Sequence, residues 1–182
     1  PIQIGSLTTW ADISSGFQHT HAIKTDGTLW AWGNAGSGRL GDGTTTAKSS
    51  PVQIGSLTNW AKLSYGGGHS DKFMHAIKTD GTLWGWGQAT GGRLGDGTST
   101  EKSSPVQIGS LTDWADVSRG AGHCHAIKTD GTLWAWGYNS VGRLGNGSSS
   151  GTTSSPIQIG SLTNWSKISA GGTHTTAIKT DG

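Results

Sequence analysis

The feature that most restricts the fold of this chain is a segment that repeats about every 50 residues. The first ten residues, Pro-Ile-Gln-Ile-Gly-Ser-Leu-Thr-Thr-Trp, return with one or two changes at Pro51, Pro105 and Pro156, which gives spacings of 50, 54 and 51 residues. A fixed period of this length is typical of repeat architectures, in which each unit is one small motif that packs on its neighbours. We therefore expect residues 1–182 to form a single array of about three and a half units, the last of them incomplete.

Each unit has the pattern of four short strands separated by clusters of Gly, Ser and Thr. In the second unit the strands are expected at 51–54, 60–64, 75–79 and 82–87. Asp80-Gly81 between the last two strands predicts a tight hairpin, because both residue types accept the positive φ that such turns require. Trp84 and Trp86 alternate with other apolar or small residues, so both faces of their strand are apolar, as in a strand between stacked sheets.

Four-stranded units can stack radially as a propeller or linearly as a solenoid. Coils of a parallel β-helix are usually shorter than 50 residues and do not contain Asp-Gly hairpins. The pattern therefore favours an all-β fold made of β-propeller blades, each with four antiparallel strands.

The order of motifs in these units resembles the regulator of chromosome condensation repeat family, in its bacterial and bacteriophage-like form. The resemblance is carried by three segments: Leu-Trp-Ala-Trp-Gly-Asn-Ala-Gly-Ser-Gly-Arg-Leu-Gly-Asp-Gly-Thr (29–44), the stretch 49–64, and Gly66 to His69 followed by His-Ala-Ile-Lys-Thr-Asp-Gly (75–81). It extends over the whole chain. This chain has Gly-Arg-Leu-Gly where the family usually has Gly-Gln-Leu-Gly. The resemblance implies propellers, commonly of seven blades, that serve as nucleotide-exchange factors, inhibitors of other proteins or adhesive modules.

The number of strands bears on whether the ring closes. Three units of four strands and a fourth of three make 15, too few for the seven blades that the resemblance implies. We therefore expect a segment of a seven-bladed propeller or of a longer array, which does not close alone. A ring of two chains is the alternative, although thirty strands do not divide evenly into four-stranded blades.

Composition argues against several classes of partner. Thirteen Lys and Arg against eleven Asp and Glu leave a net charge of +2, and the basic residues are scattered, so nucleic acid is not expected. No apolar stretch approaches the ~20 residues of a membrane span, so no membrane insertion is expected. Cys124 is the only cysteine and does not indicate a compartment.

Residues that could carry chemistry have simpler explanations in the repeat. The first histidine of each unit recurs (His19, His69, His123, His174), as a scaffold position would, whereas the second is replaced by Thr176 in the last unit. The Asp-Gly pairs are explained by turns, and the Gly-rich loops lack the lysine and helix of a phosphate loop. We therefore expect no enzyme activity, no catalytic or metal-binding residues and no cofactor.

Specificity is expected from residues that differ between units, because the repeated ones are needed by the scaffold. Phe17, Tyr65 and Arg119 are predicted to meet at one rim, with the Gly-Arg-Leu-Gly loops on the opposite rim. The insertion at 70–74 contributes Phe73 and Met74, although Phe73 has the alternative of packing on its own blade. Repeated tryptophans, by contrast, should be buried between blades: Trp30, Trp84 and Trp134. The predicted partner-binding residues are Phe17, Tyr65, Phe73, Met74, Arg119 and Tyr138.

The function that we infer from the sequence is a non-enzymatic binding or adhesion module. It would act as a scaffold for protein–protein interaction in a bacterial surface protein or a phage virion component, and hence outside the cell, on its surface or on the virion. Its partner would be another protein or a neighbouring subunit, with a surface glycan as a further candidate. The alternatives are a guanine-nucleotide exchange factor for a small GTPase and a carbohydrate-binding propeller.

Overall fold

The computed structural model describes residues 3–4, 8–68 and 71–182, which form strands, turns and three short 3₁₀ turns. The first sheet, blade 1, has its strands in chain order and antiparallel: β1 (Trp10–Gly16), β2 (His19–Lys24), β3 (Leu29–Gly33) and β4 (Lys48–Gln53). Blade 2 repeats this order with β5 (Trp60–Leu63), β7 (Phe73–Lys78), β8 (Leu83–Gly87) and β9 (Lys102–Gln107).

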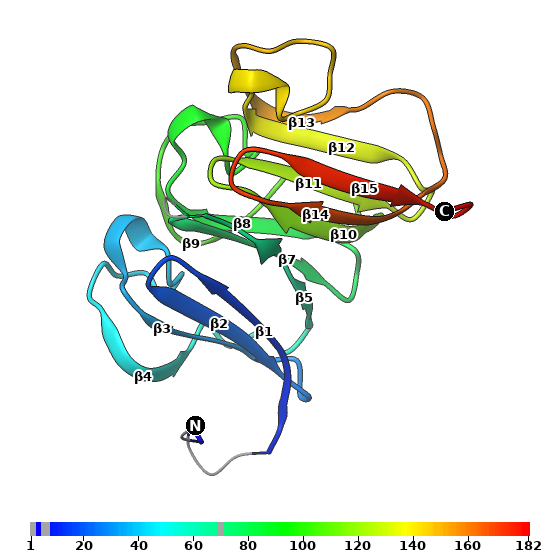
Figure 1. The fold of residues 1–182 in the computed structure, drawn as a ribbon. Helices are drawn as coiled ribbons and strands as arrows, with labels where there is room; N and C mark the ends of the chain where they lie inside the picture. The colour runs from blue at the N-terminus through cyan, green and yellow to red at the C-terminus, as the bar shows by residue number, and fades with distance from the viewer. Residues whose placement is uncertain (1–2, 5–7, 69–70) are drawn as a thin grey trace.

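Blade 3 comprises β10 (Trp114–Arg119), β11 (His123–Lys128), β12 (Leu133–Tyr138) and β13 (Thr152–Gln158), and blade 4 comprises β14 (Trp165–Ala170) and β15 (Thr175–Lys179). The two-residue strand β6 (Tyr65–Gly66) continues the inner strand of blade 2 and pairs in parallel with β10. The 3₁₀ turns are η1 (Gly36–Gly38), η2 (Thr90–Gly92) and η3 (Ser140–Gly142). Figure 1 shows the blades following one another from blue to red. The predicted all-β fold with four-stranded antiparallel sheets is confirmed.

The blades are offset from the sequence repeat. The strand that opens each sequence unit pairs with the third strand of the preceding blade; β4, for example, lies beside β3, with Gln53 opposite Trp30. The chain leaves β3, makes the loop that contains Gly-Arg-Leu-Gly, and returns antiparallel along the same edge. Each blade therefore takes its outer strand from the next sequence unit. The corresponding first strand at the start of the chain lies partly outside the described residues.

The Thr-Asp-Gly hairpins form as predicted. Gly27 has a φ of 76°, and the Asp26 carboxylate accepts hydrogen bonds from the amide and the hydroxyl of Thr28 at 3.0 and 2.7 Å. The Thr28 hydroxyl in turn accepts a hydrogen bond from Trp30 Nε1 at 2.8 Å. The same network is present in blades 2 and 3. Local turn chemistry thus fixes the pairing of the two middle strands.

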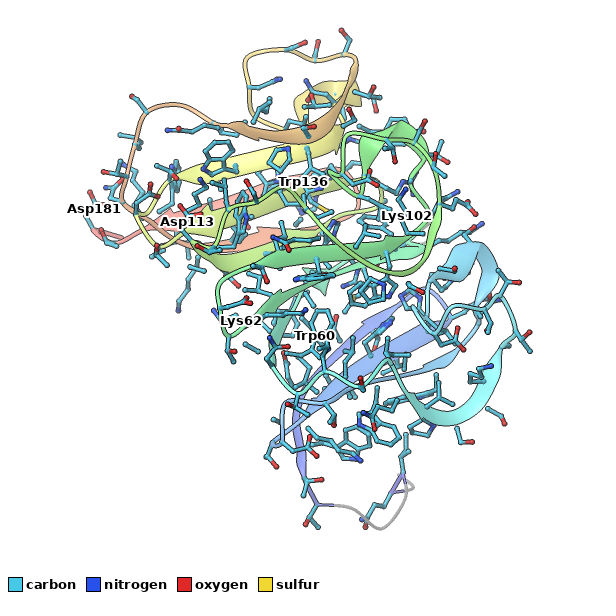
Figure 2. The ribbon with its side chains drawn as sticks, turned by 180° about the vertical axis from the view of Figure 1, so that it is seen from behind. Trp60, Lys62, Lys102, Asp113, Trp136 and Asp181 are labelled. Carbon is cyan, nitrogen blue, oxygen red and sulfur yellow. The ribbon has the colours of Figure 1, made fainter. Side chains whose placement is uncertain are left out.

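The core between blades contains the second tryptophan of β8 and of β12, not the first. Trp86 and Trp136 are completely buried, and Figure 2 labels Trp136 among the side chains between sheets. Trp84 is only half-buried, with Lys78 Nζ 3.6 Å from the centre of its ring. The prediction that Trp30, Trp84 and Trp134 are the buried set is therefore wrong. Those rings lie nearer the hairpins, where a threonine and a lysine contact them.

The sheets do not close into a ring, as expected for part of a propeller. Within the described residues, no strand pairing joins blade 1 to β14 or β15. One face of blade 1 is uncovered: Ile13 is 57% exposed, and Trp32 is half-buried although its counterparts Trp86 and Trp136 are fully buried.

Candidate protein-docking rim

Two rims of the array can be distinguished. The hairpin rim carries the Thr-Asp-Gly turns, and the turn rim carries the turn between the first and second strands of each blade, which contains Phe17 in blade 1. The Gly-Arg-Leu-Gly loops belong to the turn rim: Arg39 donates a hydrogen bond to the Phe17 carbonyl at 3.1 Å, and the Asn34 amide donates one to the Gln18 carbonyl at 2.8 Å. The prediction that these loops lie opposite Phe17 is therefore wrong.

The inserted residues precede Phe73 and do not include it. Phe73 pairs with Gly87 in the same register as His19 with Gly33 and His123 with Gly137, so a phenylalanine occupies the histidine position in blade 2. His69, which we expected at that position, lies outside the described residues.

Phe73 and its neighbour Met74 are completely buried in β7. The Phe73 ring lies 5.6 Å from that of His75 and 5.5 Å from the guanidinium of Arg93. The expected exposure of these two side chains is wrong, because the second strand of a blade faces a neighbouring sheet. The alternative, that Phe73 packs on its own blade, agrees with the structure.

Arg119 is also completely buried and connects three blades. Its Nε donates to the Asp71 carboxylate at 2.7 Å, one terminal nitrogen donates to the Ser15 carbonyl at 3.0 Å, and the other donates to the Ser64 carbonyl and hydroxyl. Burial raises the pKa of Asp71, and the positive charge of Arg119 opposes that shift. Arg119 therefore stabilises the junction of blades 1, 2 and 3 and is not exposed to a partner.

A hollow of about 290 Å³ opens on the turn rim beside this junction. It is lined by Ser15, Gly16, Phe17, Gly67, Gly68 and Asp71. Phe17 is 38% exposed, and the next residue, Gln18, has a φ of 67°, which is uncommon for a residue other than glycine. The turn thus holds an aromatic side chain at the edge of a concave surface.

Tyr138 lies on the same rim, and Tyr65 does not. Tyr138 is half-buried, with the Arg93 guanidinium 5.3 Å from the centre of its ring. Tyr65 is 49% exposed and donates a hydrogen bond to the Asp12 carboxylate; it lines a separate hollow of about 520 Å³ on the uncovered face of blade 1. Burial, together with the bond to Asp12, raises the pKa of Tyr65 to about 12. Of the six predicted residues, the structure places Phe17 and Tyr138 on the turn rim, in blades 1 and 3 respectively.

The recurring histidines have structural partners. His21, His75 and His125 each place Nε2 near the leucine carbonyl of a Gly-Arg-Leu-Gly loop, at 3.2, 2.8 and 3.2 Å. Burial lowers the pKa of His75 and of His125 to about 4, so both rings are neutral at pH 7. In the described part of the chain, no three His, Cys, Asp or Glu side chains are placed to hold a metal ion.

Comparison with known proteins decides the family. The profile of the regulator of chromosome condensation (RCC1) repeat matches residues 26–70, 80–127 and 130–178, and a second RCC1-repeat profile matches residues 10–39. The chain belongs to the RCC1 repeat family. The resemblance inferred from its motifs is confirmed.

Relatives with similar sequences are much longer than this chain. It is 30% identical to the human E3 ubiquitin-protein ligase HERC2 over an aligned segment of 101 residues, and this segment makes up 56% of the chain and 2% of the ligase. It is 28% identical to the regulator of chromosome condensation of Xenopus laevis over an aligned segment of 103 residues, and this segment makes up 57% of the chain and 24% of that protein. The RCC1-repeat chain therefore spans a quarter or less of these relatives.

Two solved structures share the fold. Prp20p from Saccharomyces cerevisiae superposes with a TM-score of 0.82 at 18% identity, covering 94% of this chain and 44% of Prp20p. Human WBSCR16 superposes with a TM-score of 0.81 at 22% identity, covering 94% of this chain and 46% of that protein. At these identities the likeness shows the fold alone.

The expected location outside the cell, on its surface or on a virion is contradicted by these relatives. One is named for chromosome condensation, the Prp20p study concerns binding to histones, and an Arabidopsis thaliana relative, RUG3, is mitochondrial. A low charge and a Gly, Ser and Thr-rich composition follow from the turns and loops of the blades and carry no information about location. Separately, no helix among the described residues is long and apolar enough to cross a membrane.

Proposed function

We propose that this RCC1-repeat segment is a non-enzymatic module that binds another protein through its turn rim. The observation that carries the proposal is the distribution of repeated and unrepeated residues. The repeated tryptophans, histidines and Asp-Gly turns hold the blades together, whereas the unrepeated Phe17 and the insertion containing Asp71 line a hollow on the turn rim. Tyr138 adds a second aromatic side chain to the turn rim, in blade 3 and outside this hollow. Aromatic residues at the edge of a concave surface are frequent anchors of protein interfaces.

Several aspartates and the cysteine are held in structural contacts or buried, which supports a binding role over catalysis. Asp26, Asp80 and Asp130 accept hydrogen bonds within their own hairpins. Asp42 and Asp96 accept hydrogen bonds from Thr44 and Thr98 and pair with Lys48 and Lys102. Cys124 is buried, and burial raises the pKa of its thiol well above the usual value, so the reactive thiolate is disfavoured.

Relatives provide precedents for a protein partner. The Prp20p study reports binding to Gsp1p and histones, and yeast RCC1 has been solved with Kap60 bound. A glycan partner has less support, because Lys24, Lys78 and Lys128 lie over the faces of Trp30, Trp84 and Trp134 that a sugar would need for stacking.

The experiment measures binding of the immobilised chain to purified Gsp1p and to purified histones by biolayer interferometry. Phe17→Ala and Tyr138→Ala are compared with Leu57→Ala, whose side chain is 46% exposed in the loop that enters blade 2 from the hairpin rim. We expect each rim variant to weaken binding about tenfold, or ~1–2 kcal/mol, and the control to bind as the unmodified chain does. Equal binding by all variants would overturn the assignment of the rim. Accelerated release of a fluorescent guanine nucleotide from a small GTPase would instead favour the exchange-factor alternative.

A further inference from the structure

Charge is distributed unevenly between the two rims of the array. All four arginines of the chain lie at the turn rim, three of them in the Gly-Arg-Leu-Gly loops and Arg119 at the junction of the blades. The lysines that precede the hairpins are buried over tryptophan rings. In Figure 2, Asp113 at the hairpin rim and Lys102 at the turn rim lie at opposite ends of the sheets. The hairpin rim exposes the carboxylates of its turns, Asp26, Asp80 and Asp130.

The cations at the turn rim outnumber the carboxylates that could pair with them. Three ion pairs form there, at 2.7 to 3.4 Å: Lys48 with Asp42, Lys102 with Asp96 and Arg119 with Asp71. No ion pair among the described residues includes the four remaining cations: Arg39, Arg93, Arg143 and Lys72. Glu101 is the one described carboxylate at this rim outside those pairs. The turn rim therefore has an excess of three positive charges.

Arg39 carries one of these charges to the edge of the hollow beside Phe17. It is only 4% exposed; its Nε donates a hydrogen bond to the Gly36 carbonyl at 2.8 Å and one terminal nitrogen donates to the Phe17 carbonyl at 3.1 Å. Both acceptors are neutral, and the other terminal nitrogen has no acceptor among the described residues. Burying a cation without an anion is unfavourable, because the charge loses its water. A neutral donor would satisfy the same two carbonyls, so the fold alone does not explain the charge.

Blade 2 places further cations on the other side of the hollow. Lys72 follows Asp71, which lines the hollow, and the Lys72 carbonyl accepts a hydrogen bond from the amide of Gln88. The Gln88 side chain in turn accepts a hydrogen bond from Arg93 at 3.0 Å, again a neutral acceptor for a guanidinium. Positive charges from blades 1 and 2 thus lie on both sides of the concave surface that Phe17 borders.

We propose that the turn rim binds an acidic segment of another protein, whose carboxylates accept hydrogen bonds from Arg39 and Lys72 while an apolar side chain packs on Phe17. The inference rests on the function proposed above and names the chemistry of its partner. Hydrogen bonds from a cation to a carboxylate are stronger than those between neutral groups. A concave surface with low-dielectric walls also focuses the field of nearby charges on a ligand.

An acidic polypeptide fits this rim better than a nucleic acid does. Proteins that bind nucleic acid without reading its sequence neutralise several phosphates with Lys and Arg side chains along the backbone. Arg39, Arg93 and Arg119 are buried, and their donors are directed at groups of the chain itself. They provide a local positive field beside an aromatic side chain, which suits a short segment with both carboxylates and an apolar residue.

The test uses three fluorescent ligands: a peptide of four Asp-Leu-Glu repeats, a charge-reversed peptide of four Lys-Leu-Arg repeats, and a short duplex DNA. Binding to the 182-residue chain is followed by fluorescence anisotropy. We expect saturable binding of the acidic peptide and at least about tenfold weaker binding of the basic peptide and of the DNA. Affinity for the acidic peptide should fall as the salt concentration is raised from about 20 to about 200 mM, because salt screens the attraction.

Two variants and their matched controls locate the site. Arg39→Gln removes the charge and keeps a side-chain donor, and Arg143→Gln makes the same change in blade 3, where the guanidinium contacts Ser140 instead of Phe17. Lys72→Glu is compared with Lys167→Glu, an equal change in net charge on the exposed side of β14. We expect Arg39→Gln and Lys72→Glu each to weaken binding of the acidic peptide about fivefold, and the controls to change it less than about twofold.

The outcomes separate this inference from the function on which it rests. Absence of saturable binding of the acidic peptide, tighter binding of the basic peptide or the DNA, or equal effects of the variants and their controls would each overturn the inference. Phe17→Ala then tests the rim itself. If Phe17→Ala weakens binding of the basic peptide, the turn rim binds proteins but does not select acidic ones. If it changes the binding of neither peptide, the assignment of the turn rim fails as well.

Discussion

The buried pair of Arg119 and Asp71 gives the sharpest test of how the blades are held together. Arg119→Met removes the guanidinium and leaves the Asp71 carboxylate buried, with its 2.7 Å hydrogen bond lost. The Ser64 and Ser15 carbonyls lose their donors as well. Removing one partner of a buried ion pair typically costs ~3–5 kcal/mol, because the remaining charge is uncompensated. We expect a loss in the free energy of unfolding within that range.

The companion variant Asp71→Asn separates charge from hydrogen bonding. The asparagine still presents an oxygen to Arg119, so we expect a smaller loss of ~1–3 kcal/mol. In the double variant neither charge remains, and the combined loss should fall below the sum of the single losses by ~1–3 kcal/mol.

The assay is equilibrium unfolding in guanidinium chloride, followed by tryptophan fluorescence, for all four members of the cycle. Arg119→Lys serves as a further control, because it keeps the positive charge, but a single ammonium group cannot replace the hydrogen bonds that the planar guanidinium donates within and between blades. If the two single losses add to within ~0.5 kcal/mol in the double variant, the pair is not coupled and this reasoning is refuted.

Three further predictions concern histidines, tryptophans and glycines that recur from unit to unit. Burial lowers the pKa of His75 and of His125 to about 4 in the folded state, so below pH 6.5 the unfolded state binds protons that the folded state does not. The free energy of unfolding should therefore fall by ~1.4 kcal/mol per pH unit for each histidine between pH 6.5 and about 4. Unfolding midpoints that stay constant from pH 7 to pH 5 would contradict this prediction. Trp136→Ala should cost ~3–5 kcal/mol and Trp134→Ala clearly less, because only Trp136 is fully buried; equal losses in denaturant unfolding would refute that distinction. Gly41→Ala should lower the melting temperature more than Gly55→Ala does, because both have positive φ but only Gly41 contacts Trp86; the comparison fails if the two shifts match.

The repeat, the hairpins and the fold class were predictable because their signals are local. The period is written in the sequence, and Asp80-Gly81 between two apolar strands specifies a turn without reference to the rest of the chain. The offset between blade and sequence unit, in which the first strand of a unit joins the preceding blade, was not predictable in this way. The strand at 51–54 follows a long loop, and nothing in its own residues distinguishes pairing with β3 from pairing with β5.

The candidate site was predicted less well, because burial depends on register and on distant contacts. Aligning His69 with His19 by residue identity placed Phe73 in an exposed insertion. Counting back from Ala76, which lies opposite Trp84, would have placed Phe73 opposite Gly87 and inside the sheet. Arg119 gives no such signal, since its partner Asp71 is 48 residues away in the chain.

The offset between blade and sequence unit has a consequence for synthesis on the ribosome. When β3 leaves the exit tunnel, blade 1 still lacks β4, which lies beyond a loop of 14 residues, 34–47. Until that loop and β4 have emerged, the edge of β3 remains unpaired and available to other nascent chains. Synonymous changes that slow translation while residues 34–53 are emerging from the tunnel should therefore increase co-translational aggregation more than the same slowing while β1 and β2 emerge.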